Sequence, residues 1–293
     1  MRKLFLFVSL AASVCVWQQG SFAQQTADRS AAKPYKELHR AEVDALLATP
    51  EKVLIVDVRS PGEIAFNGAF PVYLSVQTEE GDTKALGIEK HLAEIPKGRQ
   101  IITVSGRANR SGYAAAFLAS KGFNVAGAVG AKTYEEEGGK LEKFKPYTHW
   151  SMNGGTPPPR GAFAARDEPK AYKEVKKAEM EDLLATPEKV LILDIRAPGE
   201  IAYWGGLPVY LNIQAAEGDT KASGIEAHLA EIPKDKPIVT VSGRANRSGF
   251  AAALLASKGF NAIGGFGAMT FGEEGGKLVK YPPYKPPTPK VEK

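Results

Sequence analysis

Short β-branched runs alternate with amphipathic segments along this chain. Residues 53–58 (VLIVDV) and 101–104 (IITV) are the kind of apolar run found in strands buried on both faces. Residues 41–48, 85–95 and 113–121 carry apolar side chains at helical spacing, Gly122 is placed to end the last of these helices, and Phe123 opens another short strand. Helices that alternate with short buried strands predict an α/β fold with a mainly parallel sheet flanked by helices.

The whole pattern occurs twice. Tyr35 recurs as Tyr172, and the segment SGRANRSG at residues 105–112 recurs unchanged at residues 242–249, both at a spacing of 137 residues. About 70% of the positions between residues 35 and 141 match their partners. A repeat this long has the size of a domain. We therefore predict two tandem domains, residues 35–147 and 172–284, joined by a Gly- and Pro-containing linker at residues 148–171 and followed by a Pro-rich tail at residues 285–293.

Residues 1–23 have the pattern of a signal peptide. Arg2 and Lys3 precede an apolar stretch too short to span a bilayer comfortably, and Ser21 and Ala23 are small residues of the kind that signal peptidase requires. We expect cleavage after Ala23, export to a bacterial periplasm and no stable membrane span in the processed chain. An uncleaved membrane anchor and a lipid-modified Cys15 are the alternatives.

The composition of the chain argues against several kinds of partner and site. The 293 residues are 43% hydrophobic and 24% charged, and the net charge of +5 is spread along the chain without a dense basic stripe, so we expect no nucleic-acid partner. Cys15 is the one cysteine, so the processed chain has no thiol for a disulfide, a thiolate metal site or a persulfide. No His and carboxylate spacing fits a metal site, and we expect neither a metal nor another cofactor.

The repeated segment SGRANRSG is a candidate anion-binding loop. It follows a buried strand and leads into a helix, where unpaired N–H groups and the helix dipole favour negative charge. Its arginines add donors that suit sulfate-like or phosphate-like groups. The alternative is that they pair with local carboxylates such as Asp57 and Glu63. The predicted anion-binding residues are Ser105, Gly106, Arg107, Ala108, Asn109, Arg110 and Ser111, with Ser242, Gly243, Arg244, Ala245, Asn246, Arg247 and Ser248 in the second copy.

Each copy resembles a rhodanese homology domain. The opening segment EVDALLATPEKVLIVDVRSPGEI is similar to the opening segment of that family, with its Asp-x-Arg and a following Glu, and GAVGAKTY and GGFGAMTF are similar to its later Gly-Gly and aromatic motif. The resemblance implies that SGRANRSG is the active-site loop, which in the family begins with cysteine and ends with arginine before a serine. It implies supporting roles for Asp57, Arg59, Glu63, Asp194, Arg196 and Glu200.

Two departures change the expected function. The Gly-His-Ile segment of the family is replaced by Gly68, Ala69 and Phe70, and by Gly205, Gly206 and Leu207 in the second copy. More importantly, Ser105 and Ser242 stand at the cysteine positions. The resemblance implies sulfur transfer, of the thiosulfate sulfurtransferase type, through a cysteine persulfide. A serine oxygen cannot form that sulfur–sulfur bond, so we predict that both copies are inactive as sulfurtransferases and have no catalytic residue of that kind.

Three functions remain open at this stage. The first is a non-catalytic module that binds a small oxyanion or an acidic protein partner, with Arg110 and Arg247 supplying charge. The second is an enzyme with unusual chemistry, either a serine-based hydrolase or a sulfurtransferase whose thiol comes from a partner. A serine nucleophile needs a general base, and the candidates are His91 and His228, ahead of the strands that feed the loops. The third is a structural relic whose arginines are held in internal ion pairs.

Overall fold

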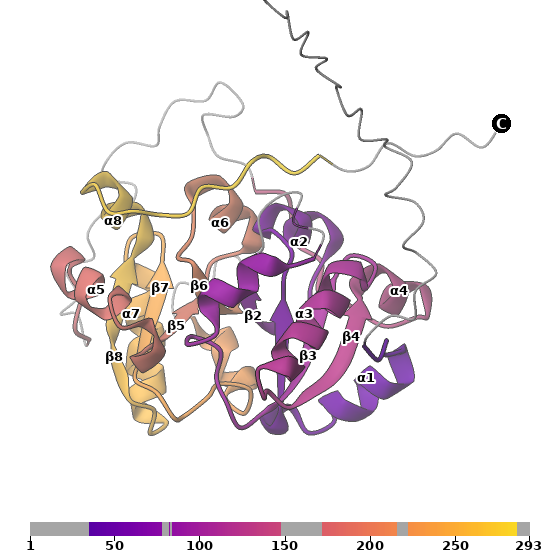
Figure 1. Ribbon diagram of the computed structural model, residues 1–293. Coiled ribbons are helices and arrows are strands. Elements are labelled where there is room, and N and C mark those ends of the chain that lie inside the picture. The colour runs from indigo at the N-terminus through magenta and orange to yellow at the C-terminus, as the bar shows by residue number, and fades with distance from the viewer. Residues whose placement is uncertain (1–34, 78–81, 83, 148–171, 216–221, 286–293) are drawn as a thin grey trace, which may run out of the picture. The chain divides into compact units, whose positions relative to one another are not determined.

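Helices and short strands alternate through both repeats, as Figure 1 shows for the computed structural model, which describes residues 35–77, 82, 84–147, 172–215 and 222–285. The predicted signal peptide and linker, and nearly all of the predicted tail, lie outside these residues. No helix among the described residues is long and apolar enough to cross a membrane. The first repeat contains α1 (Arg40–Leu47), η3 (Pro50–Lys52), β1 (Val53–Asp57), α2 (Pro61–Asn67), β2 (Val72–Val76), η4 (Leu86–His91), β3 (Gln100–Ser105), α3 (Asn109–Ser120), β4 (Val125–Gly130) and α4 (Ala131–Glu136).

The second repeat has the same elements in the same order. They are α5 (Lys177–Leu184), η6 (Pro187–Lys189), β5 (Leu191–Asp194), α6 (Pro198–Trp204), β6 (Val209–Ile213), η7 (Ser223–His228), β7 (Ile238–Ser242), α7 (Asn246–Ser257), β8 (Ala262–Gly267) and α8 (Ala268–Glu273).

The helix that we expected at residues 85–95 is a short 3-10 helix instead, from Leu86 to His91. Ala85 before it has a left-handed backbone, with φ of 53°, and Gly87 donates its N–H to the Asp82 carboxylate at 2.8 Å. A left-handed residue at the start and a glycine in the first turn both disfavour a longer α-helix. The helical spacing of the apolar residues was therefore correct as a sign of burial and wrong as a sign of helix type.

Among the described residues, the eight strands belong to one sheet, in the order β4-β3-β1-β2-β6-β5-β7-β8. Neighbouring strands within each repeat are parallel, whereas β2 and β6 pair antiparallel and join the two repeats. This confirms the predicted α/β fold with a mainly parallel sheet. The sequence did not predict that the sheet is continuous, because each repeat alone is compatible with a separate sheet.

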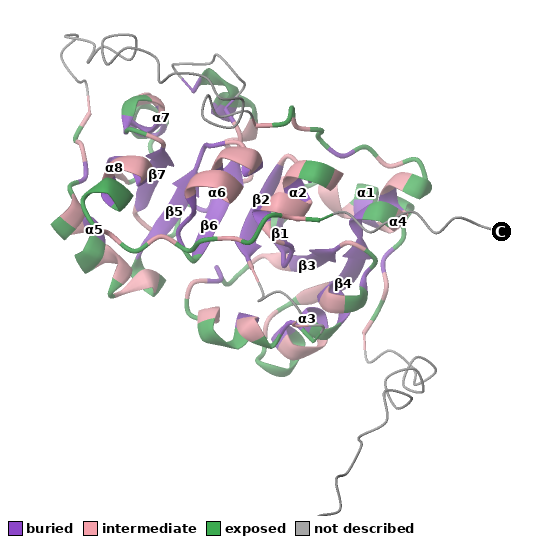
Figure 2. Cartoon of the chain, turned by 90° about the horizontal axis from the view of Figure 1, so that it is seen from above, coloured by how far each residue is buried: buried purple, intermediate pink, exposed green. Residues whose placement is uncertain are grey.

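Helices cover both faces of the sheet. On one face, side chains from α3, α7, η4 and η7 pack on the strands of both repeats and form a single core. On the other face, α1, α2 and α4 cover the first repeat, while α5, α6 and α8 cover the second. Figure 2 shows the strands as buried and the outer faces of the helices as exposed. One shared core means that the two repeats stabilise each other.

The ends of the two repeats cross over. Tyr147, at the end of the first repeat, packs on α6 of the second, with its ring 5.6 Å from that of Tyr203. The matching Tyr284 of the second repeat packs on α2 of the first, with its ring 5.6 Å from that of Phe66. Because α2 and α6 carry two of the predicted site residues, each repeat helps to hold the site of the other.

Candidate anion-binding loops

The loop of the first repeat connects the end of β3 to the start of α3. Ala108, the residue before the helix, has a left-handed backbone with φ of 57°, which turns the chain sharply into the helix. The first turn of a helix leaves N–H groups without intrahelical acceptors. Within the described chain, we find no acceptor for the N–H groups of Arg107, Ala108, Asn109 and Arg110. These four N–H groups are the donors that the loop can offer to an anion.

The loop is held against Tyr35 at the start of the repeat. The Tyr35 hydroxyl donates to the carbonyl of Ala108 at 3.2 Å. Gly112, in the first turn of α3, lies directly against the ring, and a Cβ there would come within 2.0 Å of it. The pairing recurs between Tyr172 and Ala245, at 3.1 Å. From the sequence these tyrosines are only markers of the repeat, because their contact with the loop joins segments 73 residues apart.

Ser105 lies at the base of the loop and is 1% exposed. Its hydroxyl accepts the N–H of Ser111 at 3.2 Å and lies 3.0 Å from the Ser111 hydroxyl. The Ser111 hydroxyl donates to the carbonyl of Val129, so the proton between the two hydroxyls comes from Ser105. The Ser105 hydroxyl thus donates one hydrogen bond and accepts another, both with Ser111.

The second loop repeats this arrangement almost atom for atom. Ser242 accepts the N–H of Ser248 at 3.2 Å and lies 3.0 Å from its hydroxyl, while Ser248 donates to the carbonyl of Phe266. Ala245 has φ of 61°. The two loops therefore have the same backbone conformation and the same serine hydrogen bonds.

Arg110 is paired with Glu63, one of the two carboxylates expected as alternative partners of the loop arginines. The Arg110 guanidinium donates to one carboxylate oxygen at 2.5 Å, and the other oxygen accepts the N–H of Ser60 at 3.0 Å. Arg247 and Glu200 form the same pair at 2.7 Å. The side chains of both pairs are about one fifth to one quarter exposed, so solvent and ligands can reach them.

Arg107 is paired with Glu136, on α4, through two hydrogen bonds of 2.7 and 2.8 Å. The hydrogen bonds raise the pKa of Arg107 and lower the pKa of Glu136. Arg244 and Glu273 form the corresponding pair in the second repeat. These acids were not among the predicted site residues, although they recur at the same spacing as the loops. Because both side chains of the first pair are about half exposed, the pair adds little stability.

Asp57 and Arg59 pair with each other and not with the loop. Both are fully buried, and the carboxylate accepts three hydrogen bonds from the guanidinium, the shortest at 2.6 Å. Burial opposes the charged form of Arg59, but the charge and hydrogen bonds of Asp57 outweigh it and raise its pKa. Asp194 and Arg196 form the same buried pair. Their geometry supports a structural role beneath α2 and α6.

The two buried pairs differ in one contact. The Arg196 guanidinium also donates to the carbonyl of Gly205 at 3.0 Å, whereas the matching nitrogen of Arg59 has no hydrogen-bond partner among the described residues. A second difference is Asn212, whose amide donates to the carbonyls of Asp194 and Arg196, at 2.8 and 3.0 Å. Its counterpart Ser75 is too short to make these bonds. The buried polar groups around this ion pair therefore make more hydrogen bonds in the second repeat than in the first.

Neither candidate general base reaches a loop serine. His91 pairs with Glu94 at 3.0 Å, and His228 pairs with Glu231 at 3.2 Å. Among the described residues, the hydroxyls of Ser105 and Ser242 are hydrogen-bonded to no histidine or carboxylate. The same part of the chain contains no group of three or more His, Cys, Asp or Glu residues that could hold a metal ion.

No family model and no curated protein matches the chain. Solved structures to which it is similar include a rhodanese-related protein from Thermoplasma volcanium, which is 24% identical over 37% of this chain and 98% of that one, with a TM-score of 0.31. A thiosulfate sulfurtransferase from Pseudomonas aeruginosa is 20% identical over 87% of this chain and 47% of that one, with a TM-score of 0.29. A 3-mercaptopyruvate sulfotransferase from Escherichia coli is 17% identical over 77% of this chain and 95% of that one, with a TM-score of 0.26. This chain spans about half the length of the Pseudomonas protein.

Proposed function

We propose that this chain is an exported, rhodanese-like protein whose two loops bind small oxyanions, or an acidic group of a partner protein, without transferring sulfur. The order of motifs within each repeat supports the family assignment, together with the strand–loop–helix arrangement around SGRANRSG. The signal-peptide pattern of residues 1–23 supports export.

The position of Ser105 supports the absence of sulfur transfer. A persulfide carrier needs sulfur at the base of the loop, and both repeats have oxygen there. Cys15, the one cysteine, lies in the segment that we expect to be removed. A serine-based hydrolase is not favoured, because the Ser105 hydroxyl already has partners and none of them is a base.

The observation that carries the binding proposal is the set of N–H groups from Arg107 to Arg110, which have no acceptor in the described chain. They lie at the start of a twelve-residue helix, where the helix dipole adds attraction for an anion. Arg110 adds a guanidinium, but its charge is balanced by Glu63. Because this balance reduces the net charge of the site, we expect weak binding, with dissociation constants of about 1 mM.

Calorimetric titration of the full chain with sulfate, thiosulfate and phosphate tests this proposal. The double variant R110A/R247A is expected to lose most of the binding, because one charged donor is removed from each loop. The matched control is R40A/K177A, which removes two cations at equivalent positions of α1 and α5, the first exposed and the second partly exposed. The proposal is wrong if the unmodified chain binds none of these anions, or if both double variants bind them equally. The Arg110–Glu63 and Arg247–Glu200 pairs would then have a structural role only.

A further inference from the structure

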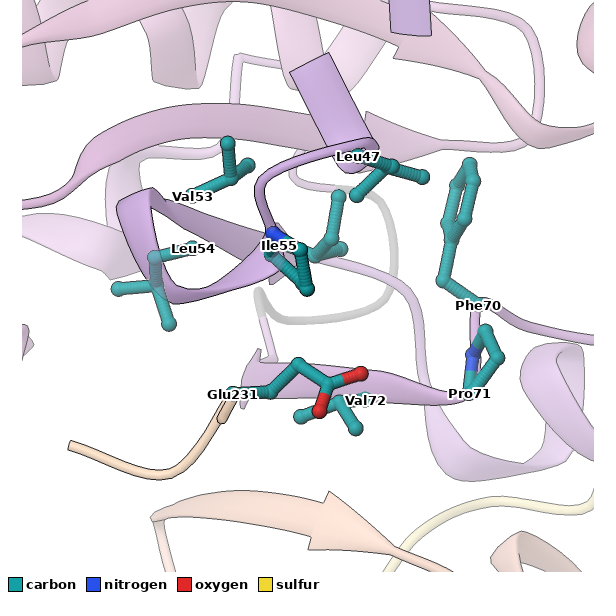
Figure 3. Close-up of a pocket in the computed structure, with 9 residues that line it drawn as sticks. Leu47, Val53, Leu54, Ile55, Phe70, Pro71, Val72 and Glu231 are labelled. Carbon is teal, nitrogen blue, oxygen red and sulfur yellow. The ribbon is translucent and has the colours of Figure 1, made fainter. Parts of the chain in front are cut away.

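An apolar pocket lies at the opposite end of the strands from the loops. Each loop follows the carboxyl end of a strand, whereas this pocket lies at the amino end of β1. It has a volume of about 230 Å³, and Figure 3 shows the side chains around it. Most of its lining is apolar, and the contributing side chains include those of Leu47, Val53, Ile55, Phe70 and Val72. The proposed anion-binding function does not use this site.

The pocket arises where two neighbouring strands diverge. β1 pairs with β3 along its whole length, from Val53 to Asp57. Its pairing with β2 begins only at Val56 and Leu74. The first three residues of β1 therefore have a strand on one side and the pocket on the other.

The size and lining of the pocket suit one small aromatic ring with a short chain. An apolar cavity of about 150 Å³ is large enough to hold benzene. The additional volume of this pocket accommodates a short linker and a polar group. Phe70 offers a ring for contact, and Leu47 and Val72 offer branched aliphatic side chains.

Glu231 is the charged residue in the lining, and it comes from the second repeat. In Figure 3 its carboxylate lies beside Val72, on the opposite side of the pocket from Leu47. One carboxylate oxygen is 3.2 Å from Nδ1 of His228, on the same segment. The side chain is about one fifth exposed, so its charge is poorly screened by water on the pocket side.

Arg99 and His228 both contact Glu231. The guanidinium of Arg99 donates to the backbone carbonyl of Glu231 at 2.5 Å. Arg99 also lies in the field of Asp235 and Glu51, as well as that of Glu231. One guanidinium thus faces three carboxylates, and the hydrogen bond between His228 and Glu231 raises the pKa of His228. A cation is therefore favoured over an anion at this end of the pocket.

We propose that this pocket binds a primary arylalkylamine, with the ring between Leu47, Phe70 and Val72 and the ammonium group against the carboxylate of Glu231. The ring displaces water from apolar walls, and the ammonium group donates to the carboxylate of Glu231. The site requires both repeats, because the first supplies the apolar walls and the second supplies the charge.

Phenethylamine is a suitable probe for the full chain in solution. Methyl NMR spectra would report binding directly at Leu47, Val53 and Val72. We expect saturable shifts of these methyl signals with a dissociation constant of about 1 mM, the affinity typical of a ligand of about nine heavy atoms. Phenethyl alcohol, which has the same ring without the charge, is expected to bind about tenfold more weakly.

Two charge variants distinguish the pocket from general attraction. E231Q is expected to weaken phenethylamine binding about tenfold at the same methyl groups, because it removes the charge and keeps the shape. E226Q is the matched control on the same segment, where Glu226 is about half exposed and pairs with Lys258, and it should leave binding unchanged. The proposal is overturned if phenethylamine shifts none of these methyl signals at 10 mM (about ten times the expected constant), or if E231Q and E226Q have equal effects.

Discussion

Leu74 and Leu211 occupy equivalent positions in the two repeats and face each other across the antiparallel pairing of β2 with β6. Residues on either side of this pair also match in reverse order, so that Tyr73 faces Asn212 and Ser75 faces Tyr210. The two repeats are therefore related by a local two-fold axis through the Leu74–Leu211 pair. Such an axis is the symmetry that a homodimer of one repeat would have.

We predict that a fragment of residues 35–147 forms a dimer through β2. Without the second repeat, β2 becomes an exposed, apolar edge strand with unpaired backbone groups, which favours pairing with another copy. Analytical ultracentrifugation of the fragment should show a dimer, and the full chain should be a monomer. S75P, which places a proline within this edge strand, should make the fragment monomeric or unfold it, whereas S75A should not. A folded, monomeric fragment without the substitution would contradict the symmetry argument.

The crossing ends of the repeats make a second prediction, on stability. A Cβ on Gly199 would come within 2.7 Å of the Cβ of Tyr147, so G199A must displace the end of the first repeat from α6. We expect G199A to lower the free energy of unfolding by about 1–3 kcal/mol, as for other overpacked sites. A Cβ on Gly106 would meet no other atom within 4 Å, so the control variant G106A should change stability by less than about 0.5 kcal/mol. Urea denaturation would measure the free energy of unfolding of both variants. Equal effects of G199A and G106A would argue against the packing of Tyr147 on α6.

Because of Tyr134, we expect the free energy of unfolding to fall at alkaline pH. Burial, followed by the hydrogen bond that its hydroxyl donates to Asp44, raises its pKa from 10.0 to about 12. The protonated form is favoured in the folded state, so this contribution to stability is complete below pH 10 and is lost as the pH rises to about 12. Phe271 occupies the matching position in the second repeat and cannot titrate. Urea midpoints from pH 8 to 12 should fall more steeply for the unmodified chain than for Y134F; parallel curves would contradict this assignment.

Restoring sulfur at the base of one loop tests its resemblance to the rhodanese active site. In a C15S background, S105C places a thiol at the end of β3, below N–H groups and a helix start that favour the thiolate. We predict that this thiolate attacks the outer sulfur of thiosulfate, which releases sulfite and leaves a cysteine persulfide that cyanide then converts to thiocyanate. Mass spectrometry should show the added sulfur atom on S105C and none on C15S alone. A thiol that stays unmodified in excess thiosulfate would contradict the family assignment.

The sequence predicted those features that depend on neighbouring residues. Residues 53–57 and 101–104 form strands because a continuous apolar run suits burial on both faces, and the loop lies between a strand and a helix, as the motif predicted. Pairing of β2 with β6 could not be predicted, because it joins segments more than a hundred residues apart and leaves no local signature. The pairing of Arg107 with Glu136 was also missed, because it depends on where α4 lies relative to the loop.

We propose that each loop is an anion site, and that a carboxylate, Glu63 or Glu200, partly neutralises the positive charge of the loop arginine. Calorimetric titration of E63Q/E200Q with thiosulfate tests it most directly, because these substitutions leave Arg110 and Arg247 in place and remove the competing charge. We predict about fivefold tighter binding than in the unmodified chain, which corresponds to about 1 kcal/mol, with no sulfur transferred to the protein. Unchanged or weaker binding, or sulfur carried on the chain after the titration, would contradict it.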